Sequence, residues 1–155
     1  MFKFSKIIAT LFYIGFFPYA SGTISSLASM IFFYSMIDYI SIKYTLIIFF
    51  ITLIISVKCI DIYSVKIKKD DSSEIVVDEF LGIALIMIFY DFLKFSNDIN
   101  MLIIIFILFR FFDIVKIFPA NWIDKNIKNS WGVILDDLIA AIYTCITLLI
   151  LNALI

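Results

Sequence analysis

Acidic residues inside apolar segments are the first candidates for chemistry in this sequence. Asp78 and Glu79 follow three aliphatic residues, and so do Asp136 and Asp137, while Asp113 lies near the end of another apolar run. Ionisable groups at such positions are costly and usually mark a site. Carboxylates gathered around one point can bind one or two Mg²⁺ ions, which neutralise phosphate charge and activate a water molecule. The residue types therefore indicate phosphoryl hydrolysis.

Two basic residues accompany Asp113. Arg110 precedes it by three positions and Lys116 follows it by three, so on a helix Arg110 and Asp113 share a face and Lys116 lies a turn further on. A basic group there could bind phosphate oxygens while Asp113 holds the metal. The chain has no histidine, and its two cysteines, Cys59 and Cys145, are far apart in the sequence. Any metal would therefore be held by carboxylates, which suit Mg²⁺.

Helix electrostatics offer an alternative explanation for each acidic cluster taken singly. Carboxylates are favoured in the first turn of a helix, because the helix dipole is positive there. This effect could account for one acidic pair, but both pairs lie inside the apolar boundary of their segments. Asp113 lies near the carboxyl end of its segment, where the negative end of the helix dipole disfavours a carboxylate. The set as a whole therefore favours a site.

The composition is that of a membrane protein. Hydrophobic residues make up 64% of the chain, against about 45–50% in an ordinary soluble domain. A chain of 155 residues cannot bury so much apolar surface in a water-soluble core. We therefore expect an integral membrane protein with a single membrane-embedded domain over residues 1–155. The net charge of −1 and the lack of a basic patch argue against a nucleic-acid partner.

Five apolar stretches approach the roughly 17–25 residues that a membrane-spanning helix needs. We expect an all-α integral membrane protein, a helical bundle with four or five transmembrane helices plus a short amino-terminal helix over residues 4–17. Gly82 and Gly132 are expected to let helices approach closely. Linkers over residues 61–74 and 119–130 are charged or polar. The stretches cover residues 24–42 (interrupted by Asp38), 44–60, 75–93, 101–118 and 133–155.

The distribution of basic residues predicts an orientation. If all five stretches cross the membrane and the amino-terminal helix does not, every lysine and arginine except Lys43 and Lys94 lies on the side that holds the linker 61–74. Cytoplasmic loops carry such an excess of Lys and Arg, so this side is expected to be cytoplasmic. All five carboxylates lie near the end of their segments on this same side. Segments far apart in the sequence are therefore expected to present their acidic groups to one layer of the membrane.

Four motifs resemble those of the phosphatidylglycerophosphatase A family. Residues 74–82, EIVVDEFLG, resemble its IVxDExxG signature, and residues 109–119, FRFFDIVKIFP, are similar to FRxFDxxKPxP. Residues 132–140, GVILDDLIA, resemble GxxxDDxxAG, and Gly22-Thr23 with Ser26-Leu27 resembles PGTxGSL. The motifs occur in the family's order and cover nearly the whole chain. Departures such as Ser21 and Ile117, where the family usually has proline, remove no charged group.

The resemblance implies a Mg²⁺-dependent enzyme of the bacterial cytoplasmic (inner) membrane, with its site on the cytoplasmic face. Its substrate would be a phospholipid, phosphatidylglycerophosphate, which it would hydrolyse to phosphatidylglycerol and phosphate. By matching position, the metal-binding and catalytic carboxylates would be Asp78, Glu79, Asp113, Asp136 and Asp137, and phosphate would be bound by Arg110, Lys116, Gly22 and Thr23. Direct attack by water and a phospho-aspartyl intermediate both remain open, as do the number of metal ions and the oligomeric state.

An ion- or proton-coupled transporter that uses buried carboxylates is the alternative function. Such a protein usually carries charges near the bilayer midplane and a paired-repeat organisation. Here the carboxylates are expected at one face, Asp38 and Asp91 lie toward the other, and the middle of the stretches carries no charge. The pattern favours the phosphatase over the transporter.

Overall fold

Helices make up the secondary structure of the computed structural model, which describes residues 1–69, 72–93 and 99–154. No strand occurs in these residues, so the all-α prediction is confirmed. Asp70, Asp71 and Lys94, which the sequence placed in linkers, lie outside the described residues. In chain order the elements are α1 (Phe2–Ala9), the short 3-10 helix η1 (Ile14–Phe16), α2 (Ser21–Met36), α3 (Ile42–Ile67), α4 (Val77–Phe92), α5 (Ile99–Val115), α6 (Ala120–Asn126) and α7 (Ser130–Leu154).

Several helix boundaries differ from the prediction. Helix α3 continues through Asp61 to Ile67 and ends at Lys68, where φ is 57°. The end of an apolar stretch was therefore not the end of the helix, because charged residues are compatible with helix outside the apolar layer. The linker 119–130 contains α6. The predicted amino-terminal helix is broken after α1, where the Thr10 hydroxyl donates to Lys6 O and accepts from the backbone N–H of Tyr13.

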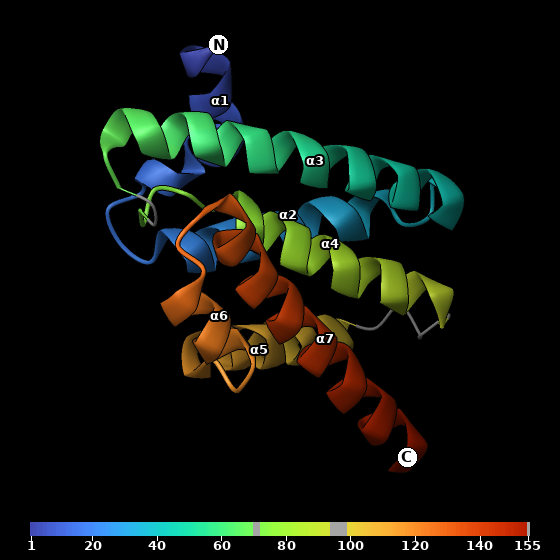
Figure 1. The fold of residues 1–155 in the computed structure, drawn as a ribbon. Coiled ribbons are helices and arrows are strands. Elements are labelled where there is room, and N and C mark those ends of the chain that lie inside the picture. Colours follow the sequence, from blue (N-terminus) through green and yellow to red (C-terminus); the bar gives the residue numbers. More distant parts are fainter. Residues whose placement is uncertain (70–71, 94–98, 155) are drawn as a thin grey trace.

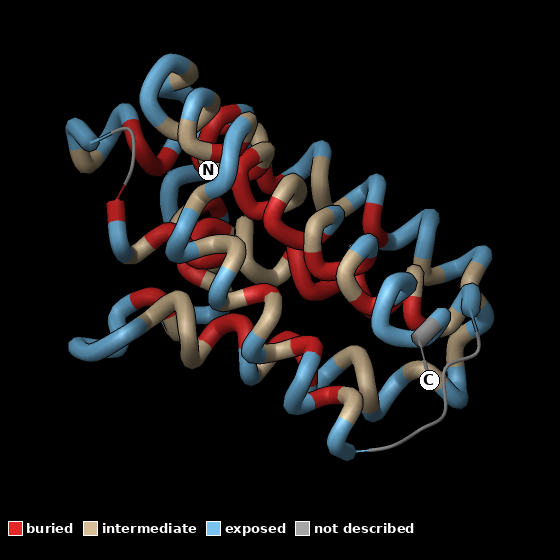
Figure 2. Tube along the Cα trace, turned by 90° about the horizontal axis from the view of Figure 1, so that it is seen from below, coloured by how far each residue is buried: buried red, intermediate tan, exposed pale blue. Residues whose placement is uncertain are grey.

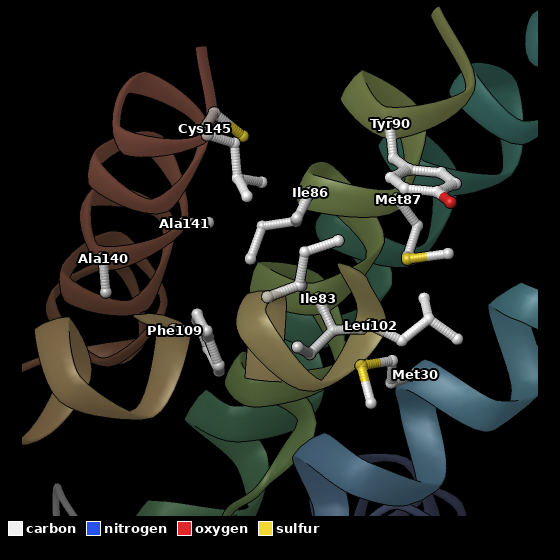
Figure 3. Close-up of a cluster of buried hydrophobic side chains, with 12 residues drawn as sticks. Met30, Ile83, Ile86, Met87, Tyr90, Leu102, Phe109, Ala140, Ala141 and Cys145 are labelled. Carbon is white, nitrogen blue, oxygen red and sulfur yellow. The ribbon is translucent and has the colours of Figure 1, made fainter. Parts of the chain in front are cut away.

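Helix α4 lies at the centre of the bundle and packs against α2, α3 and α7 (Figure 1). One of its faces contributes Ile83, Ile86 and Tyr90 to a core shared with α2, α5 and α7. Figure 3 shows this face between Met30 of α2 and Ala141 of α7. Another face joins a second core with α1, α3 and α7. A helix that is apolar all round is expected to be buried all round, as α4 is.

Gly82 makes the close packing around α4 possible. A Cβ atom at this position would lie 2.8 Å from the Phe109 ring of α5 and 3.3 Å from the backbone oxygen of Asp137 in α7. The expectation that Gly82 lets helices approach is therefore confirmed, and the approach occurs beside Asp137. Gly132 has a different role from the one expected, because its Cβ would collide with the backbone of Ile127, in the loop between α6 and α7.

The outer surface is apolar. Buried residues concentrate where the helices meet, and the exposed turns lie outside (Figure 2). Exposed patches of this kind are typical of a surface that faces lipid. Exposed isoleucines recur along the outer faces of α3, α5 and α7, namely Ile47, Ile51, Ile54, Ile103, Ile107, Ile142, Ile146 and Ile150.

Two helices of the described residues are long and apolar enough to cross a membrane. They are α3 and the part of α7 from Ser130 to Ala153. Helices α2, α4 and α5 have only 16, 16 and 17 residues, somewhat fewer than the ~20 needed to cross the hydrocarbon layer. Membrane association is therefore supported, whereas four or five crossings stay a prediction.

Candidate active site

A polar cavity of about 410 Å³ opens at the end of the bundle where α4 and α7 begin and α5 ends. In Figure 1 this is the end at which α6 lies beside the start of α7. The cavity gathers residues from segments that are far apart in the sequence. Among its lining residues are eight of the nine predicted site residues, namely Gly22, Asp78, Glu79, Arg110, Asp113, Lys116, Asp136 and Asp137.

The start of α4 is held in place by hydrogen bonds between the backbone that precedes it and two other elements. The Val76 N–H donates to Ala9 O at 3.0 Å, at the end of α1. The buried Ser25 hydroxyl of α2 donates to Val76 O at 2.8 Å, and that of Ser21 donates to Ser73 O. Because Val76 directly precedes α4, these bonds fix the position of the next turn, which carries Asp78.

Three carboxylates form a close group in this cavity. Asp78, Glu79 and Asp137 each offer one oxygen within 4.8 Å of the others. Within the described part of the chain, Glu79 Oε2 and Asp137 Oδ2 are buried without a hydrogen-bond partner. Buried negative charge requires a compensating positive group. Hard oxygen donors in such a group fit a hard divalent cation such as Mg²⁺, and neither cysteine lines the cavity.

The other two predicted carboxylates form ion pairs. Asp113 Oδ2 lies 2.8 Å from a terminal nitrogen of Arg110, as their spacing on one helix face predicted. The same nitrogen lies 4.0 Å from Glu79 Oε1 and 3.4 Å from Ser26 Oγ. Asp136 Oδ2 accepts a hydrogen bond of 2.6 Å from Lys116 Nζ. The structure thus gathers three of the predicted ligands in one close group, which Arg110 approaches at Glu79, and places the other two in closer ion pairs with Arg110 and Lys116.

Gly22 provides the space in which Glu79 and Arg110 meet. A Cβ atom on Gly22 would collide with Glu79 Oε1 and lie 3.4 Å from the terminal nitrogen of Arg110. The first turn of α2 can therefore approach these side chains only without a side chain of its own. Thr23, the ninth predicted residue, is not among the cavity-lining residues.

Lys116 does not continue the face of α5 as expected. The helix ends at Val115, and Lys116 adopts a φ of 46°. Its ammonium then lies between Asp136 of α7 and Asp124 of α6, whose Oδ1 is 2.8 Å away. Sequence reasoning missed Asp124, because the linker 119–130 was read as a loop. The only available signal was an acidic residue eight positions after Lys116.

The charges of Lys116, Asp124 and Asp136 stabilise one another. Burial of Lys116 opposes its charge, but the hydrogen bonds to Asp124 and Asp136 and their negative charges outweigh burial and raise the pKa of the ammonium. The hydrogen bond from Lys116 lowers the pKa of the Asp124 carboxyl below its ordinary value, against the effect of partial burial. Lys116 is therefore a fixed positive charge on the cavity wall.

Helix electrostatics account for only part of this arrangement. Asp78 and Glu79 do lie in the first turn of α4. Helix α7, however, begins at Ser130, so Asp136 and Asp137 lie beyond its first turn, where the dipole effect has fallen off. The residues expected toward the other face, Asp38 and Asp91, line a separate cavity together.

Comparison with known proteins agrees with the motifs. A family model described as Phosphatidylglycerophosphatase A matches residues 7–152. A phosphatidylglycerophosphatase A from Haemophilus influenzae is 31% identical over 127 residues, covering 82% of this chain and 76% of the relative. The protein of that name from Escherichia coli is 29% identical over 141 residues, covering 88% of this chain and 76% of the relative.

No solved structure matches this chain. The family match nevertheless extends over all the elements that line the cavity, from η1 to α7. The chain therefore belongs to the phosphatidylglycerophosphatase A family, and its enzyme class is that of the phosphatases.

Proposed function

We propose that this protein is a Mg²⁺-dependent lipid phosphatase that hydrolyses phosphatidylglycerophosphate to phosphatidylglycerol and inorganic phosphate. The observation that carries the proposal is the group formed by Asp78, Glu79 and Asp137, with two buried oxygens that lack a partner in the described residues. Arg110 and Lys116 line the same cavity. Family membership supports the same reaction.

The group of three would hold Mg²⁺, and Asp113 and Asp136 lie in the same cavity as further candidate ligands. A bound ion would neutralise phosphate charge and lower the pKa of a water molecule in this site. Arg110 would donate N–H groups to the phosphate oxygens, because its guanidinium is presented to the cavity by Asp113. Gly22 keeps the space in front of these groups free.

The proposed location is the bacterial cytoplasmic membrane, with four or five helices crossing it and the cavity at the cytoplasmic face. The basic residues support this orientation, since Arg110, Lys116 and Lys128 line the cavity itself. A phosphorylated lipid whose headgroup faces the cytoplasm would reach the cavity without leaving the membrane. The transporter is not favoured, because the matching family is one of phosphatases and the acidic groups gather at one end of the bundle.

The first experiment measures phosphate release from phosphatidylglycerophosphate in detergent micelles by the purified protein. We expect release in the presence of Mg²⁺, loss of release on addition of EDTA, and recovery when Mg²⁺ is restored in excess. No release from protein whose helical circular dichroism and thermal transition are intact would overturn the proposed reaction. Release that EDTA leaves unchanged would overturn the metal dependence alone.

We expect Asp124 to act through Lys116. Replacing Asp124 with Asn removes one of the two carboxylates that hold the ammonium. The expected loss of activity is about tenfold, the lower range for partners of site residues. Lys116→Ala is expected to cost more, and the double variant no more than Lys116→Ala alone, because coupled residues are not additive. Additive losses in this double-mutant cycle would show that Asp124 acts by another route.

A further inference from the structure

We propose that an apolar groove bounded by the amino-terminal segment and by α2, α3 and α4 holds an acyl chain of the phospholipid substrate. The inference rests on the proposed function and adds to it a binding site for the lipid chain. The groove, called here the α2–α3 groove, has a volume of about 360 Å³. Helices α2 and α3 both pack against α4 (Figure 1), and α4 contributes Val77 and Phe80 to the lining of the groove. Its walls include Phe12, Ala28, Phe32, Thr52 and Phe80.

The α2–α3 groove and the catalytic cavity are lined by neighbouring residues of the same two segments, although they have no lining residue in common. On α4, Val77 and Phe80 line the groove, while Asp78 and Glu79, between them in sequence, line the cavity. At the amino-terminal segment, Ile14 lines the groove and the neighbouring Gly15 lines the cavity. The two spaces are therefore neighbours along the same segments. A molecule whose phosphate lies in the cavity has the groove within reach of its apolar part.

The chemistry of the groove suits an aliphatic chain. Of its lining residues only Ser29 and Thr52 are polar, and the Ser29 hydroxyl already donates to Ser25 O at 2.7 Å. The catalytic cavity, in contrast, is lined by Lys116, Asp124 and Lys128, whose charges would lose solvation beside an apolar chain. The groove is thus an apolar space beside a polar cavity.

The direction of the groove also suits a lipid chain. Phe32 lines both the groove and a second apolar cavity of about 80 Å³, which continues past Met36 and Ile40. The apolar path therefore follows α2 from its catalytic end toward its other end. A lipid chain attached to a headgroup at one membrane face runs in the same direction.

The groove would orient the lipid rather than add affinity. Lipid tails are as apolar as the side chains of the groove, so a chain gains little by moving from the bilayer into the protein. A chain that lies in a fixed groove does, however, place its phosphate at a fixed point, and orientation strongly affects reaction rates. The groove should therefore matter for turnover of a lipid and not for turnover of its free headgroup.

The test compares tryptophan variants on two substrates. Ala28→Trp and Thr52→Trp fill the groove from α2 and from α3, and the adjacent exposed positions provide matched controls, Leu27→Trp and Ile51→Trp. The substrates are long-chain phosphatidylglycerophosphate in micelles and its deacylated, water-soluble headgroup. We expect the groove variants to release phosphate from the lipid about tenfold more slowly than the controls, the effect of a misfitted apolar contact, and from the headgroup at the control rate.

Two outcomes would overturn the proposal that the groove binds an acyl chain. One is lipid turnover by the groove variants at the rate of their controls, and the other is an equal loss on both substrates. Failure of the wild-type protein to release phosphate from the lipid would instead contradict the proposed function, so the two failures are distinguishable.

Photolabelling of the wild-type protein gives a second test that needs no variant. The probe is phosphatidylglycerophosphate with a diazirine at the end of one acyl chain. We expect labelled peptides from the groove positions of α2 in preference to Ile51 and Ile54 on the outer face of α3. Excess unlabelled phosphatidylglycerophosphate should suppress this labelling and excess phosphatidylethanolamine should not. Equal suppression by both lipids would identify a structural lipid, and uniform labelling would mean ordinary bilayer contact; either would overturn the proposal.

Discussion

Asp137→Asn is expected to lower the rate of phosphate release by about three orders of magnitude. The substitution removes a carboxylate from the group with Asp78 and Glu79, whose oxygens lie within 4.8 Å of one another. A metal ion contributes several kcal/mol to transition-state stabilisation, and about 1.4 kcal/mol corresponds to a factor of ten in rate. The measurement is phosphate release at saturating Mg²⁺ with the purified variant.

The same variant is expected to be more stable than the wild type when the metal is removed. Neutralising one of three adjacent carboxylates relieves like-charge repulsion in a poorly solvated place. The new amide can also donate to the buried oxygen of Glu79, which lacks a partner in the described residues. We expect a gain of about 1–3 kcal/mol in the free energy of unfolding, the cost of an unsatisfied buried group.

Asp38→Asn serves as the control, since Asp38 is exposed and lines the cavity at the other end of the bundle. It should leave the rate of phosphate release unchanged. Thermal unfolding followed by tryptophan fluorescence in EDTA compares the stabilities. Full activity of Asp137→Asn would remove the centre of the proposed site, and lower stability in EDTA would contradict the electrostatic argument.

Arg110→Ala is expected to lower kcat by about two to three orders of magnitude. This is the usual effect of removing a hydrogen-bond donor that stabilises transition-state charge. Arg110 pairs with Asp113 at 2.8 Å and lies 4.0 Å from Glu79. Its removal deletes the proposed phosphate donor and leaves the Asp113 carboxylate without that partner. Arg110→Lys keeps the charge but not the planar fork of donors, so an intermediate rate is expected.

Lys43→Ala is the matched control for Arg110. Lys43 is exposed in the first turn of α3, at the end of that helix away from its Lys68 terminus. The Lys43→Ala variant is expected to leave kcat unchanged. Separate determination of kcat and KM distinguishes a donor used in the transition state from one that only binds the ground state. An effect on KM alone would assign Arg110 to substrate binding.

The sequence determined the helical class and the residue types of the site. Continuous apolar stretches required helices, because backbone groups in an apolar environment must be satisfied within their own segment. The three-residue spacing of Arg110 and Asp113 predicted their ion pair, since that spacing is a property of any α-helix. The cost of placing carboxylates in apolar segments predicted that Asp78 and Asp137 would gather with the others, and one cavity does contain them.

Which of these residues form the close carboxylate group and which form ion pairs depends on the tertiary structure. The grouping of Asp78, Glu79 and Asp137 depends on the approach of α7 to α4 beside Gly82, a contact between segments more than fifty residues apart. Lys116 reaches Asp124 because α5 ends before it and α6 packs against α7, which no local pattern encodes. The α2–α3 groove likewise exists because two helices pack against a third. Local spacing determines which side chains share a helix face, whereas distances between helices depend on packing throughout the bundle.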